Sequence, residues 1–103
     1  MKRKPRDPRK PPLESDITKS IREWLKLRGI FHWKVFQSLG ATPGIPDIIC
    51  VVNGLFVGIE VKTENGKLSE KQEEFKNNVT REGGVYLVAR CTQDVIDFFE
   101  GEF

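Results

Sequence analysis

Two carboxylates and a lysine, Asp47, Glu60 and Lys62, stand among runs of Ile, Val and Phe in the middle of the chain. Asn53-Gly54 lies between the two apolar runs, and this dipeptide is the strongest short-range signal of a two-residue β-hairpin turn. Across such a turn the numbers of paired residues have a constant sum, which places Asp47 directly opposite Glu60 on one face of the hairpin. Lys62 shares that face because side chains alternate along a strand.

The opposed carboxylates carry an electrostatic cost. At ~5 Å and an effective dielectric constant of ~20, two such charges repel by about 3 kcal/mol. Because both faces of these strands are otherwise apolar, we favour a site in which Asp47 and Glu60 share a divalent cation, and paired carboxylates suit Mg²⁺ or Mn²⁺. Two alternatives remain open: the acids lie at a solvated hairpin end where Lys62 neutralises them, or a β-bulge changes the register.

Two further residues are candidates for the same site. Glu14 stands three residues before Ile17 and seven before Ile21, which places it on the inner side of a first helix as a third acid. Its alternative role is that of a favourable negative charge in a first helical turn. Gln72 stands three residues after Ser69, and this capping-box spacing explains both residues by itself.

Composition excludes several classes of protein. The chain has 103 residues, 38% of them hydrophobic, which indicates a single globular domain. One histidine, His32, and two cysteines, Cys50 and Cys91, argue against a Ser-His-Asp set, a dedicated zinc site and a disulfide framework. We expect reduced thiols in an intracellular, cytoplasmic protein of bacterial or viral type, without a small-molecule cofactor. No apolar run approaches the roughly 20 residues of a membrane span.

The hydrophobic pattern predicts an α/β domain in the order α-β-β-β-α-β-α, a mixed central sheet flanked by helices. The predicted elements are a helix at 13–28, a strand at 31–35, a loop at 37–46, the hairpin, a helix between Ser69 and Gly83-Gly84, a strand at 85–89 and a last helix from Thr92. The strand at 85–89 is almost wholly apolar, which favours the interior of the sheet.

Residues 1–12 form a basic, proline-rich arm ahead of a domain at 13–103. The arm has six Lys or Arg and one Asp, a net charge of +5, so the remaining residues carry −3 of the total of +2. Such an arm either binds nucleic acid or is a solvated terminus, and composition does not decide between them.

Gly44-Ile45-Pro46-Asp47 followed by Glu60-Val61-Lys62 resembles the PD-(D/E)XK nuclease signature, and the hairpin between the motifs and the element order agree with it. With Glu14, the glycine-containing loop and Gln72 in order, the chain is similar to a stand-alone VRR-NUC domain, the virus-type replication-repair nuclease. The resemblance covers about residues 13–99 and implies a single restriction-endonuclease-like domain.

What the resemblance implies is hydrolysis of phosphodiester bonds with Mg²⁺ or Mn²⁺. Lys62 would orient or activate the attacking water, or stabilise the charged transition state. Gln72 would orient groups near Lys62 or contact the nucleic-acid backbone. The implied metal ligands are Asp47, Glu60, the backbone carbonyl of Val61, and Glu14 either directly or through water.

The implied partner is DNA, which a slightly acidic body has to bind through local basic patches. Candidates are the arm and Lys34, Lys67 and Lys71, although the last two also fit an ordinary solvated helix face. Some stand-alone relatives act as dimers on branched DNA, so the resemblance raises a homodimer that resolves four-way (Holliday) junctions. Alternatives are a nuclease of flaps, ends or single strands working with a helicase, and a non-catalytic DNA-binding module. Four aromatic residues are expected in the core, with a dimer face as their alternative place: Trp24, Trp33, Phe98 and Phe99.

Overall fold

The computed structural model describes residues 9–102, so most of the predicted arm lies outside the described residues. The element order is the predicted one, with a mixed four-stranded sheet in the order β1-β2-β3-β4. The elements are α1 (Glu14–Leu27), β1 (His32–Lys34), β2 (Ile48–Val52), β3 (Leu55–Val61), α2 (Glu70–Arg81), β4 (Val85–Ala89) and α3 (Thr92–Glu102).

The hairpin of β2 and β3 has the predicted register. Antiparallel pairs run from Ile48 with Ile59 to Val52 with Leu55. The turn residues both have positive φ, 52° at Asn53 and 81° at Gly54, which a two-residue type I′ turn requires.

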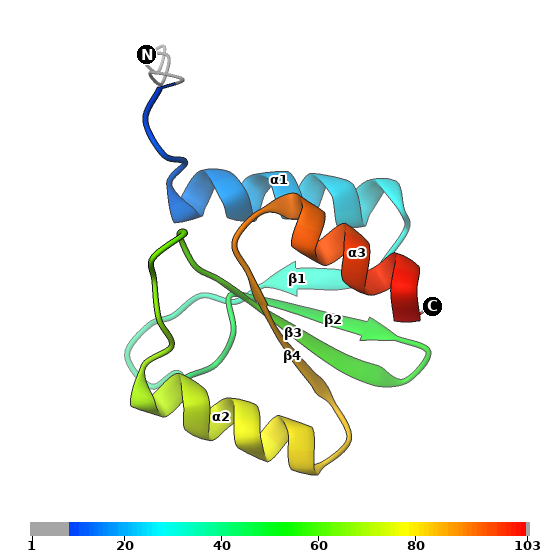
Figure 1. The fold of residues 1–103 in the computed structure, drawn as a ribbon. Helices are drawn as coiled ribbons and strands as arrows, with labels where there is room; N and C mark the ends of the chain where they lie inside the picture. Colours follow the sequence, from blue (N-terminus) through cyan, green and yellow to red (C-terminus); the bar gives the residue numbers. More distant parts are fainter. Residues whose placement is uncertain (1–8, 103) are drawn as a thin grey trace.

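Helices cover the two faces of the sheet unequally. In Figure 1, α1 and α3 lie together on one face, and α2 lies on the other. The face under α1 and α3 carries the hydrophobic core, because alternate residues of the hairpin point there. Its fully buried side chains include Ile21, Leu25, Ile48, Val57 and Ile59.

On the opposite face, the loop before β2 packs tightly. A Cβ atom at Gly58 would come within 2.6 Å of Cγ of Pro46, so only glycine allows the loop to rest on β3 at this point. Gly44 has a φ of 81° and lies against the backbone of Lys71 in α2, which fixes the other side of the loop. The residues before Asp47 are therefore held between the sheet and α2.

The prediction of an interior place for the strand at 85–89 is wrong. β4 lies at the edge of the sheet and pairs only with β3, in parallel. Its apolar composition has another cause: it contacts α2 on one face and α3 on the other. A strand can thus be covered on both faces without a hydrogen-bonded neighbour on both sides.

The four aromatic residues expected in the core differ in their burial. Phe99 is buried, and Trp24 and Phe98 pack against the core from partly buried positions. Trp33 is 41% exposed, because α2 does not reach the β1 end of its face of the sheet. Among residues 9–102, each helix is too short or too polar to cross a bilayer.

Candidate active site

Asp47 lies immediately before β2, and its side chain links the start of β2 to the end of β3. Its Oδ2 accepts a hydrogen bond of 2.8 Å from the backbone N–H of Val61. The register of the hairpin, continued to this point, would set Val61 opposite Pro46. The carboxylate of Asp47 thus accepts a hydrogen bond from the last N–H of β3. The backbone carbonyl of Asp47 accepts a 2.8 Å bond from the N–H of Val35.

Glu60 is a buried acid on β3, only 2% exposed. Within the described residues its Oε1 is buried without a hydrogen-bond partner, an arrangement that costs free energy. Burial, and next the neighbouring Asp47, raise the pKa of Glu60 to about 8, against an opposing effect of Lys62. Burial and Asp47 therefore favour the protonated carboxyl, and a further positive charge at this point would favour the ionised form.

Lys62 lies beside Glu60, as the strand alternation predicts. Its Nζ is 3.8 Å from Oε2 of Glu60, and its side chain is largely buried. Its backbone N–H donates a 3.0 Å bond to the carbonyl of Ala89, which fixes it on β4. Asp47, Glu60 and Lys62 thus come together on the face of the sheet that carries α2.

Val61 presents its backbone, not its side chain, to this group. Its side chain is in the core, and its N–H points to Asp47. The N–H and C=O of one strand residue point to the same side, so the Val61 carbonyl is directed toward the side on which Asp47 lies.

Glu14 and Gln72 lie at the margins of this group. Glu14 is exposed at the first turn of α1, and its charge is the smallest of the influences that raise the pKa of Glu60. Gln72 forms the capping box of α2: its Oε1 accepts a 2.9 Å bond from the N–H of Ser69, and its N–H donates to Oγ of Ser69 at 3.2 Å. The structural role predicted for Gln72 is thus present.

The three predicted DNA-binding lysines do not form one patch. Lys34 lines a hollow with residues of α1, on the face of the sheet away from α2. Lys67 lies in the segment before α2, and Lys71 in its first turns pairs with Glu74 at 3.5 Å. Only Lys67 and Lys71 lie on the side of α2.

Three residues of this region were not predicted from the sequence. Gln37 donates from Nε2 to Oδ1 of Asp47 and to the carbonyl of Ile45, both at 3.2 Å. Tyr86 is buried, and its pKa is raised by burial and by the charges of Glu60 and Asp47. The register of β3 with β4, which pairs Gly58 with Tyr86, would have placed Tyr86 beside Glu60, but no sequence pattern announces that pairing.

Arg90 is the third unpredicted residue. Its Nη1 donates to the carbonyls of Thr63, Glu64 and Gly66, at 2.6, 3.2 and 2.8 Å. These bonds tie the segment that follows Lys62 to the end of β4. Arg90 is therefore a structural cation that holds Lys62 in place.

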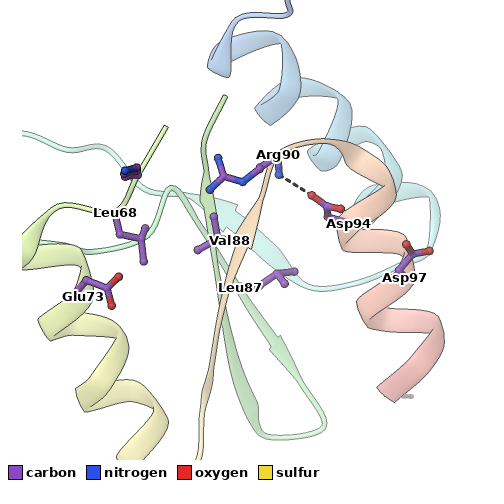
Figure 2. Close-up of a pocket in the computed structure, with 8 residues that line it drawn as sticks. Leu68, Glu73, Leu87, Val88, Arg90, Asp94 and Asp97 are labelled. Carbon is purple, nitrogen blue, oxygen red and sulfur yellow. Dashed lines mark hydrogen bonds between the residues drawn. The ribbon is translucent and has the colours of Figure 1, made fainter. Parts of the chain in front are cut away.

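A separate hollow lies away from the acids. It has a volume of about 690 Å³ and follows the free edge of β4 (Figure 2). Leu68 and Glu73 lie on one side of the strand, and Asp94 and Asp97 on the other, where Asp94 accepts a 2.8 Å bond from the N–H of Arg90. Its lining includes neither Asp47 nor Glu60, so we do not assign the chemistry to it.

Within residues 9–102 no group of three or more Asp, Glu, His or Cys side chains is close enough to hold a metal ion. A cation at the acids would therefore have two carboxylates and a backbone carbonyl as its protein ligands. That set fits Mg²⁺, which is held through one or two carboxylates and keeps several water or phosphate ligands.

Comparison with known proteins gives one consistent answer. The model of the VRR-NUC domain matches residues 13–93. A solved structure described as a VRR_NUC domain superposes with a TM-score of 0.74 at 23% identity, covering 87% of this chain and 97% of that one. Another, described as a VRR_NUC domain protein, has a TM-score of 0.70 at 24% identity and covers 88% of each chain. These two likenesses are evidence of fold. No curated protein matches the sequence.

Proposed function

The chain belongs to the VRR-NUC domain family, a nuclease-type domain, and we propose that it is a metal-dependent DNA endonuclease. The observation that carries this proposal is the buried Glu60 carboxyl, with one oxygen unpaired beside Asp47 and Lys62. A small domain gains no stability from this arrangement, because burial of an acid beside another acid is unfavourable. A function that supplies positive charge at this point accounts for it.

The residues present fit a divalent cation. Oε1 of Glu60 is an unsatisfied buried acceptor, and carboxylates accept more than one partner, so Asp47 can bind a metal while it bonds to Val61. We assign Mg²⁺ or Mn²⁺ to Asp47, Glu60 and the Val61 carbonyl, with Glu14 reached through water. When bound, the cation polarises a phosphate oxygen and acidifies water.

The residues of the chain have separate tasks in hydrolysis. Lys62, held by Ala89 and the Arg90 bonds, carries a positive charge at the place where the phosphate gains negative charge in the transition state. Gln37 and Val61 fix both oxygens of Asp47, so this ligand needs little reorganisation. Gln72 uses its Oε1 in the cap of α2, which leaves its amide nitrogen to contact a phosphate or to orient groups near Lys62.

For the substrate we propose branched DNA, with four-way junctions cut by a homodimer. The support is the family resemblance and the small size of the domain, whose seven short elements leave little room for a separate substrate-reading part. A two-fold dimer would carry two sites and make paired nicks. Lys67 and Lys71 lie on the α2 side, where the DNA backbone would approach.

The test is a cleavage assay on labelled four-way junction, flap, duplex and single-stranded DNA, each with Mg²⁺, Mn²⁺ or EDTA. Lys62→Ala is the inactive variant, and Lys19→Ala, an exposed lysine on α1, is the matched control. Paired nicks in the junction, dependent on metal and lost only in Lys62→Ala, are the expected result. Cutting of flaps or single strands alone would move the substrate to the helicase-associated alternative. Salt-sensitive binding without cutting would make the domain a non-catalytic binding module.

A further inference from the structure

A short row of aromatic side chains lies beside the acids on the same face of the sheet. Val51 N–H donates to the carbonyl of Phe31, and Trp33 pairs with Ile49. The rings of Phe31 and Trp33 contact each other, with centroids 5.6 Å apart, so both project to one side. We call Phe31 and Trp33 the aromatic row.

The aromatic row is continuous with the catalytic group. The same register sets Val35 opposite Asp47, as the bond from Val35 N–H to the Asp47 carbonyl requires. Trp33 is therefore two residues from the position next to Asp47, a distance of roughly 6.5 Å along the strand. Phe31 lies two residues beyond Trp33 in the same direction, away from Asp47.

The row is exposed although it is apolar. Phe31 is 68% exposed and Trp33 41%, and Phe36, in the loop that leads to the acids, is 82% exposed. Gln37, the next residue of that loop, bonds directly to Asp47. Aromatic groups in this position are not explained by the core, which lies on the other face of the sheet.

We propose that the aromatic row stacks unpaired bases of the nucleic acid that flank the bond to be cut. The inference rests on the proposed function. A phosphodiester held at Asp47 and Glu60 has its neighbouring nucleotides within reach of Trp33, since only one cross-strand pair separates them. Rings accept bases of any sequence on their faces, and a base can stack there only after it has left a duplex.

The inference narrows the substrate class. A continuous duplex offers no unpaired base to the row, whereas a junction with splayed strands, a flap or a single strand does. The lysines near α2 would contact the backbone and the aromatic row would select unpaired bases. Selectivity for DNA structure would thus reside in two side chains, Trp33 in β1 and Phe31 immediately before it.

Tryptophan fluorescence tests the contact directly. The chain has two tryptophans, and Trp24 is partly buried between Phe99 and Arg28, away from the acids. Thymidine oligonucleotide is added to the full chain in EDTA, so that no cleavage occurs. Quenching of tryptophan fluorescence is expected in the wild type and in Trp24→Phe, in which Trp33 is the only tryptophan. No quenching is expected in Trp33→Phe, the matched control.

Affinity supplies the second measurement. Trp33→Ala and Phe31→Ala are expected to weaken binding of the oligonucleotide by roughly five- to hundred-fold, the range for loss of one stacked base. Binding of a blunt duplex should stay within about two-fold. Equal losses on both DNAs, or quenching that persists in Trp33→Phe and not in Trp24→Phe, would overturn the inference.

Two further outcomes separate this inference from others. A change of sedimentation in Trp33→Ala, with unchanged oligonucleotide affinity, would assign the aromatic row to contact between two copies of the chain and refute stacking. Quenching in a protein that cuts no DNA would uphold the aromatic row and defeat the proposed endonuclease. Metal-dependent cutting without quenching would uphold the proposed endonuclease and refute stacking on the aromatic row.

Discussion

The two faces of one strand, β3, have opposite character. Val57, Ile59 and Val61 point to the face covered by α1 and α3, where each is fully buried among apolar side chains. Gly58, Glu60 and Lys62 alternate with them on the face of α2 and the loop before β2. The first face is sealed by two helices, whereas the second is covered by one helix and a loop. A single strand therefore supplies the core with its odd residues and the candidate site with its even ones.

The difference shows how a small domain accommodates an unfavourable group. Among residues 9–102, the buried core cluster on the apolar face contains no charged side chain, so its stability does not depend on a ligand. The other face holds a buried acid close to a second acid, and its occupants are positioned by the backbone that the first face stabilises. Substitutions on the two faces should thus separate activity from stability.

Lys62→Ala is expected to have the largest effect, a loss of at least about 10²- to 10³-fold in the cleavage rate, since a positive charge at the reacting phosphate is removed. The chain should still fold, because Lys62 lies on the face of α2, outside the hydrophobic core. Cleavage rate and circular dichroism on the same preparation check this. A variant that cuts at near wild-type rate would remove Lys62 from the mechanism.

Ile59→Ala, three residues before Lys62 and on the other face of the sheet, should reverse this pattern. We expect a loss of about 2–5 kcal/mol in the free energy of unfolding, and Ile59→Val should lose about 0.5–1.5 kcal/mol. Cleavage per folded molecule should remain close to wild type. Urea unfolding followed by cleavage at a temperature where both variants are folded makes the measurement; a selective loss of activity would mean that the faces are not independent.

Glu60→Gln tests the cost of the buried acid. The pKa of Glu60 is about 8 in the folded chain, above its ordinary value of 4.5, so the folded state binds the additional proton between these pH values. The metal-free protein should therefore lose stability as pH rises from about 5 to about 8, on the order of 3 kcal/mol. Glu60→Gln should lack this loss. Urea unfolding in EDTA at pH 5 and pH 9 measures the difference, and equal pH profiles for the two proteins would contradict it.

Gln72→Glu should produce the smallest change. Glutamate also accepts the Ser69 N–H in a capping box, so the free energy of unfolding should stay within about 0.5 kcal/mol. The amide donor is lost, and we expect cleavage to fall about tenfold, as for one lost hydrogen bond to a charged group. Ser69→Ala serves as control, with about 1 kcal/mol less stability and unchanged cleavage per folded molecule. Equal cleavage in wild type and Gln72→Glu would leave Gln72 with its structural role alone.

Local signals explain how much could be predicted from the sequence. Asn53-Gly54 specifies both the turn and the register, and the register brings Asp47, Glu60 and Lys62 to one face without further information. The spacing of Ser69 and Gln72 likewise predicted the start of α2. These predictions depend on residues only a few positions apart, where backbone geometry leaves few choices.

The remainder depends on which elements become neighbours. The edge position of β4 and the approach of Tyr86 to Glu60 follow from the parallel pairing with β3, which no short motif encodes. Gln37 was hidden in a loop whose path is determined by contacts of Gly44 and Pro46. The alternation around Trp33 correctly indicated a strand, but it does not reveal that one helix is too few to cover that end of the face.

The topology of the chain predicts that the hairpin forms before the rest of the sheet. Its strands are joined by two residues, so their pairing closes the shortest loop in the sheet and requires little loss of chain entropy. Asp47 and Glu60 both belong to this local unit. Lys62 and Arg90 are fixed only when β4 docks, and that contact spans the whole of α2. Asp47 and Glu60 thus belong to a part of the chain with low contact order. Lys62, the cation beside Glu60, is positioned by contacts between residues far apart in the sequence.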